Sequence, residues 1–161
     1  MPFVQVNSFV GKYALTKAFN DGNLKVIQVR DNVEFQYLNE LFGVELHDKF
    51  LNEYQSEQKY GKLLTSFAFQ DGCEVYTTRG IVEMLTALTY CHYLSEIQGI
   101  ATSVGKTVPD PEASTLASEL NMISFYNDAI HDFKVIQHYL RLNKEDYPEF
   151  KGVKKTYNYW F

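Results

Sequence analysis

The sequence predicts a mainly α-helical single domain, residues 1–161, with one short β-hairpin, and three patterns support this. Residues 79–98 have apolar side chains at helical spacing on nearly every face, which is typical of a helix in the middle of a packed domain. Residues 111–142 carry a second, longer helical stripe. Between about 65 and 78, two short β-prone runs flank Asp71-Gly72, which favours a tight hairpin. We therefore expect a helical bundle around the central helix 79–98 and the long helix 111–142.

Shorter helices are predicted ahead of the central one. Asn7 or Ser8 can cap a first helix that ends at Gly22. A short apolar stretch then leads to Asp31, which has an acidic residue three positions later and resembles a capping box that opens a second helix. Gly43 is expected to end this helix, and another helical piece follows. The expected apolar stripes of these two pieces are Phe35, Leu38, Leu41 and Phe42, and then Leu46, Phe50, Leu51 and Tyr54.

The central helix is followed by a small, flexible loop, residues 99–108, and then by strong signals for a helix start. Asp110 supplies a cap and Pro111 occupies the first helical position. Apolar residues then recur every three or four positions as far as Leu140. A helix over 111–142 would be roughly 48 Å long, and Pro148 lies beyond its expected end.

Residues 149–161 are predicted to form an extended C-terminal arm. The arm has three lysines followed by four aromatic residues within its last five positions, and it shows no helical period. An aromatic segment of this kind is unfavourable in water unless it lies on another surface. That surface is its own domain, a neighbouring copy or another protein, and the sequence leaves all three open.

Composition limits the function classes. The formal net charge is −5, and residues 31–100 carry four basic and eleven acidic side chains, so the chain lacks the basic face needed to grip nucleic acid. Aromatic residues make up 16% of the chain, with twelve Tyr and twelve Phe, and Tyr is favoured at contact surfaces. No apolar run approaches the roughly 18 residues of a membrane span, and no signal peptide is apparent. We expect a soluble protein that acts through contacts.

The sequence contains no convincing catalytic, cofactor or metal motif. Gly105-Lys106-Thr107 is similar to the end of a phosphate-binding loop, but Ile100 stands where that loop needs glycine. The two cysteines, Cys73 and Cys91, lack metal or redox spacing and are expected to be reduced, with Cys91 in the core. We therefore predict no cofactor, no metal and no enzymatic activity.

Histidines and acidic pairs are expected to be structural or solvent-exposed. The four histidines, at 47, 92, 131 and 138, show no zinc-binding spacing. Asp128 with Asp132, and Glu83 with Glu96, lie on helical faces that usually point to solvent. An enzyme that uses one of the last three histidines with a carboxylate is the weakest alternative, and metal analysis of the purified protein would test it.

Several stretches, taken in order, resemble the head-tail connector proteins of tailed bacteriophages, particularly those of phages that infect Bacteroidetes. The resemblance covers most of residues 30–150. In that family a leucine-leucine-glycine and acidic-leucine-tyrosine pattern separates two helices; here Phe42-Gly43 matches its first part and His47 replaces the usual tyrosine. The other matching stretches are 60–64, the glycine-led helix that opens at 80–85, the loop 102–106, and the end of the last helix near Tyr147-Pro148.

The resemblance implies a small, mainly helical virion protein without catalytic activity. Such subunits form a ring, generally of twelve copies, below the portal, and the ring extends the DNA channel and carries the next neck or tail protein. The resemblance also implies that the protein is made in the host cytoplasm and is located in the neck of the virion. DNA would pass through the ring without sequence-specific binding, and the protein would not contact a membrane. Loops and terminal arms grip the portal and neighbouring subunits, which implies an interface at Thr102, Val104, Lys106, Val108, Lys154, Lys155, Tyr157, Tyr159, Trp160 and Phe161.

A second interpretation stays open. A small helical, phage-encoded binding or regulatory protein, acting as a monomer or dimer with its arm packed on itself, would be equally soluble and acidic. Stoichiometry separates the two interpretations, because the second protein would stop at one or two copies.

Overall fold

The computed structural model describes residues 2–5, 8–14, 24–98, 112–152 and 156–159, with the side chains of 97, 98 and 112–120 outside the description. Within these ranges the chain is mainly α-helical with one small antiparallel hairpin, as predicted. The elements are a 3-10 turn (Gly11–Tyr13), α1 (Leu24–Phe42), α2 (Val44–Glu53), α3 (Gln58–Leu64), β1 (Phe67–Asp71), β2 (Glu74–Thr78), α4 (Ile81–Gln98) and α5 (Glu112–Leu142).

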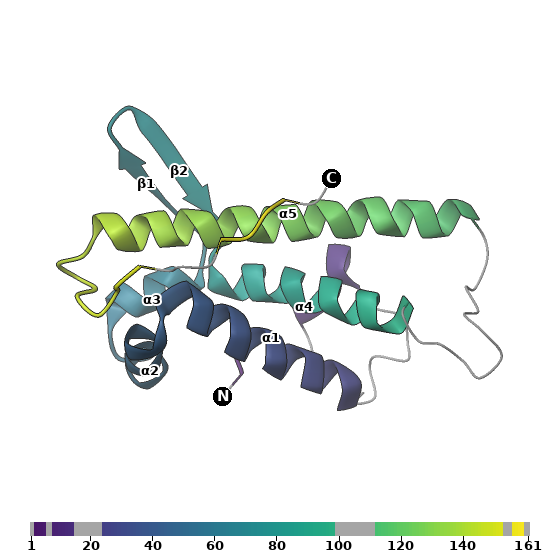
Figure 1. The fold of residues 1–161 in the computed structure, drawn as a ribbon, viewed down its shortest axis with the longest axis horizontal. Helices are drawn as coiled ribbons and strands as arrows, with labels where there is room; N and C mark the ends of the chain where they lie inside the picture. Colours follow the sequence, from purple (N-terminus) through teal and green to yellow (C-terminus); the bar gives the residue numbers. More distant parts are fainter. Residues whose placement is uncertain (1, 6–7, 15–23, 99–111, 153–155, 160–161) are drawn as a thin grey trace.

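Helix α4 lies at the centre of the arrangement, between α1 and α5, which confirms the predicted central helix (Figure 1). Helices α2 and α3 lie together at one end, and the hairpin projects away from α5. Side chains on several faces of α4 are buried, because α1, α3 and α5 all pack against it. Its fully buried residues include Ile81, Met84, Leu85, Ala87, Leu88 and Thr89.

The N-terminal helices differ from the prediction. Residues 8–14 contain the 3-10 turn Gly11–Tyr13 and no α-helix, and the rest of the predicted first helix lies outside the described residues. Asp31 does not open a helix, because α1 begins at Leu24 and passes through it. Val26, Val29 and Val33 are all buried, so the short apolar stretch and the predicted second helix form one continuous stripe.

Gly43 separates α1 from α2 as predicted, with a φ of 75° that favours glycine. Helix α3 was not predicted, because its seven residues are too few for a helical period to be recognised. Two of them, Tyr60 and Leu63, are fully buried. The Tyr147 hydroxyl donates to the Lys59 carbonyl oxygen at 2.8 Å, so the segment after α5 fixes α3 in place.

The predicted hairpin is confirmed, with register Phe67↔Thr78 to Asp71↔Glu74. Its two-residue turn begins with Gly72 at a φ of 58°, as hairpin turns with a leading glycine require. Aromatic side chains on one face of the hairpin pack on α5; Phe69 lies edge-on to Tyr139 with ring centroids 5.2 Å apart. The opposite face is exposed, and Val75 on it keeps 69% of its surface in solvent.

Gly80 joins β2 to α4 where the backbone is most crowded. Its φ is 87°, and a Cβ at this position would lie 2.4 Å from the carbonyl oxygen of Thr65. The hairpin can therefore turn directly into the central helix only with glycine here.

Among the described residues, none of the helices combines the length and apolar character needed to cross a membrane.

Candidate functional site

A charged cluster joins the hairpin to the long helix. Asp132 on α5 is 1% exposed, and it accepts hydrogen bonds from Thr78 Oγ1 at 3.0 Å, Arg79 N at 2.9 Å and Arg79 Nε at 2.7 Å. Arg79 also forms an ion pair with Asp128 at 3.3 Å. The prediction that both aspartates face solvent is therefore wrong for Asp132, because the end of β2 covers it, and right for Asp128.

The cluster extends to the N-terminal segment through Glu83. Lys12 lies 2.7 Å from the Glu83 carboxylate, and the Tyr13 hydroxyl donates to it at 3.1 Å. Partial burial alone would raise the pKa of Glu83, but the hydrogen bonds from Lys12 and Tyr13 hold this pKa below its usual value. Glu83 is therefore an ionised, paired group rather than the solvent-facing one that was predicted. The three carboxylates of the cluster (Asp128, Asp132 and Glu83) are paired with Arg79 and Lys12, so the cluster fastens the N-terminal segment, α4 and α5 together.

The histidines occupy separate places in the fold. His92 Nε2 lies 3.0 Å from the Tyr37 hydroxyl, and burial lowers the pKa of His92 and raises that of Tyr37. His138 pairs with Asp71 at 2.9 Å, while His131 is exposed on α5. Among the described residues, no three His, Cys, Asp or Glu side chains form a group that could hold a metal ion.

The cysteines also lie apart. Cys91 is buried, as predicted, and its thiol lies 3.4 Å from the Met122 carbonyl oxygen. Burial raises the pKa of this thiol to about 12, so it stays protonated and unreactive at neutral pH. Cys73 is a free, exposed thiol in the turn of the hairpin.

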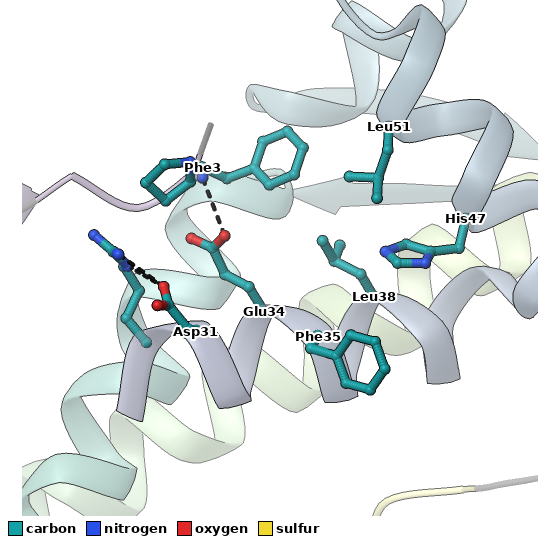
Figure 2. A pocket seen from close by; sticks show the side chains of 9 residues that line it. Phe3, Asp31, Glu34, Phe35, Leu38, His47 and Leu51 are labelled. Carbon is teal, nitrogen blue, oxygen red and sulfur yellow. Dashed lines mark hydrogen bonds and ion pairs between the residues drawn. The ribbon is translucent and has the colours of Figure 1, made fainter. Parts of the chain in front are cut away.

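A hollow of about 360 Å³ opens between α1, α2 and the N-terminal segment (Figure 2). Glu34 on α1 fixes the N-terminal segment at one side of the hollow, because its carboxylate accepts hydrogen bonds from Phe3 N at 3.2 Å and Val4 N at 2.7 Å. Burial raises the pKa of Glu34 in spite of these two bonds. Arg30 and Asp31 also line the hollow, and the apolar and aromatic part of its wall is formed by Pro2, Phe3, Phe35, Leu38, His47 and Leu51.

Two residues of this wall are exposed although the sequence placed them in apolar stripes. Phe35 keeps 70% of its surface in solvent and Leu51 keeps 42%. Phe35 lies on α1 and Leu51 on α2, on either side of the hollow (Figure 2). We call this surface the α1–α2 hollow. Exposed apolar side chains that lie together mark a contact site, whereas isolated ones do not, and Phe35 and Leu51 both line this hollow. The helical period could not separate these two residues from the core.

The C-terminal arm lies on its own domain where it is described. Phe150 is buried, and Tyr157 stacks on Tyr37 with ring centroids 5.1 Å apart and contacts the edge of Phe133 at 5.2 Å. Tyr159 remains 38% exposed. The Lys134 ammonium lies 3.8 Å from the centroid of the Tyr159 ring, across its face.

Of the ten residues in the predicted interface, the structure therefore describes Tyr157 and Tyr159 and brings both to one side of the α1–α5 pair. The sequence reasoning did not identify the α1–α2 hollow. The predicted interface residues that lie outside the described ones are Thr102, Val104, Lys106, Val108, Lys154, Lys155, Trp160 and Phe161.

Comparisons with known proteins identified no relative of this chain. The chain matches no family model, no curated protein and no solved structure.

Proposed function

We propose that the chain is a structural virion protein: the subunit of a ring below the phage portal that joins head to tail and extends the DNA channel. The observation that carries this proposal is the α1–α2 hollow, where Phe35, which is 70% exposed, and Leu51, which is 42% exposed, line the same concave surface. A surface of this kind is covered by a partner when the protein assembles.

The resemblance to head-tail connectors supplies the class of assembly. It implies a small, mainly helical subunit with projecting segments, and the fold has both a projecting hairpin and an extended C-terminal arm (Figure 1). Connector subunits use such segments to bind the portal and the next neck or tail protein.

The charge of the chain is compatible with a channel for DNA. The net charge is −5, and like charge disfavours adhesion of DNA to the wall of a channel through which it must slide. The ring would therefore guide DNA without sequence-specific contacts.

Native mass spectrometry over a range of concentrations, with negative-stain images of large species, tests this proposal. A closed ring near twelve copies, formed alone or on co-expression with a portal protein, is the expected result. A protein that stays monomeric or dimeric in both settings contradicts the ring.

The second candidate is a small helical binding or regulatory protein encoded by a phage, and one observation favours it. The described part of the arm packs on its own domain, with Tyr157 against Tyr37 and Phe133, so a monomer already covers some of the aromatic surface. In this case the same measurement gives one or two copies, and the partner is a host or phage protein.

A further inference from the structure

We propose that the α1–α2 hollow binds the aromatic end of the C-terminal arm, residues 159–161, from a second copy of this chain, while Tyr157 stays packed on its own domain. The proposal rests on the proposed ring and names the contact that joins one subunit to the next. It is argued from three observations: apolar exposure, charge and direction.

The hollow is suited to an aromatic side chain. Its volume is about 360 Å³, which lies within the range of roughly 300–1,000 Å³ for pockets that enclose small organic groups. Phe35 and Leu51 would lose their exposed apolar surface on contact. The arm offers matching groups, since Tyr159 is exposed and the sequence adds Trp160 and Phe161 after it.

The charges of the two surfaces are complementary. Residues 24–53, which span α1 and α2, contain six acidic and three basic side chains, and Arg30, Asp31 and Glu34 line the hollow. Residues 150–161 contain three lysines and no acidic side chain. One pair of this kind already forms within the chain, between Lys151 and Glu45 on α2. A basic, aromatic arm therefore fits an apolar hollow with acidic surroundings better than a neutral partner would.

The direction in which the Phe35 side chain points from α1 indicates that the arm bound there comes from a second copy and not from the same chain. Tyr37 stacks on the arm of its own chain, and Phe35 is two residues away on α1, which turns its side chain by roughly 200°. The Phe35 side chain and the chain's own arm therefore lie on opposite sides of α1. A contact between these two different surfaces is head-to-tail, and such contacts close into rings when the rotation permits.

Disulfide trapping tests the contact. In a Cys73→Ser background, which removes the exposed native thiol, we would combine Phe35→Cys with Tyr159→Cys and oxidise the full-length protein at concentrations up to about 1 mM. Tyr159 is chosen because it is described and exposed. The matched control combines Leu24→Cys with Tyr159→Cys, since Leu24 lies on the same helix and is 81% exposed.

The expected result is a ladder of covalent dimers, trimers and larger species on a non-reducing gel for the Phe35 pair and not for the Leu24 pair. Equal ladders, or no ladder from either pair, overturn the proposed contact. Cysteine at Phe35 alone should give no species beyond a covalent dimer.

Sedimentation of two charge variants gives a second readout. Phe35→Lys should weaken self-association at least tenfold, because it removes the aromatic side chain and repels the basic arm, while Leu24→Lys should leave self-association unchanged. Both residues are exposed on α1, so both variants should fold. Equal association of the two variants removes Phe35 from the interface.

The test of this contact can fail or succeed independently of the test of the proposed ring. A closed ring in which Phe35 and Tyr159 do not cross-link keeps the proposed function and rejects this contact. A ladder of dimers and trimers without any closed ring, alone or with a portal, keeps the contact and rejects the connector assignment.

Discussion

Asp132→Asn should destabilise the fold strongly, because it removes the negative charge that faces Arg79 inside the domain. Asp132 is 1% exposed and lies 2.6 Å from Arg79 Nη2, in addition to its hydrogen bonds with Thr78 and the Arg79 backbone. The amide group of the substituted side chain would also place a hydrogen-bond donor beside the donors of Thr78 and Arg79. The change keeps the size of the side chain, so the loss reports electrostatics and hydrogen bonding.

The size of the effect follows from burial. Removing one partner of a buried ion pair costs about 3–5 kcal/mol. Here the Arg79 side chain is 29% exposed and Asp128 remains at 3.3 Å, so we expect about 2–3 kcal/mol after allowing for solvent screening. For a domain of this size that loss lowers Tm by roughly 4–12 °C.

Urea denaturation followed by circular dichroism, together with thermal melts, measures the loss. Asp128→Asn is the matched control, because Asp128 pairs with the same Arg79 but its side chain is 54% exposed; we expect a cost of at most about 0.5 kcal/mol. A loss below about 1 kcal/mol for Asp132→Asn, or equal losses for the two variants, would refute the assignment of Asp132 as the buried anchor.

Three further outcomes are expected. Burial raises the pKa of Glu34 in the folded state. The protonated carboxyl therefore stabilises the fold fully at a pH below the pKa of Glu34 in the unfolded chain, and this contribution is lost as the pH rises through the folded-state pKa. Wild type should therefore gain stability relative to Glu34→Gln between pH 7 and pH 4.5 in urea titrations, and a constant difference would contradict this. Gly80→Ala should cost about 3 kcal/mol or more and Gly152→Ala about 1 kcal/mol, because both have positive φ but only Gly80 lacks room for a Cβ; equal costs would reject the crowding argument. Iodoacetamide should label Cys73 in the native protein and Cys91 only after unfolding, and mass spectrometry that finds native labelling of Cys91 would show that it is accessible.

Local patterns were enough to predict the central helix, the long helix and the hairpin. The hairpin depends on a turn of a few residues that includes Gly72, and α4 depends on apolar residues spaced along one segment. Both signals act over short sequence distances. The start of α1 was wrong by seven residues because the capping pattern at Asp31 competes with a continuous valine stripe.

The candidate site was predicted only in part. The aromatic composition of the arm singled out Tyr157 and Tyr159, and the structure places them differently, with Tyr157 packed on Tyr37 and Tyr159 more exposed. Phe35 was expected in an apolar stripe, yet it is 70% exposed. Period alone identifies residues that share a helix face, and it carries no information about whether another element covers that face.

By itself, the sequence determined the mainly helical class, the central position of residues 79–98, the hairpin turn and the break at Gly43. These follow from spacing and backbone preference, which are properties of neighbouring residues. Tertiary structure decided that Asp132 is buried against Arg79, 53 positions earlier in the chain, and that Phe35 beside α2 stays open to solvent. Burial and pairing depend on which distant segments meet, so they appear only when the helices have packed.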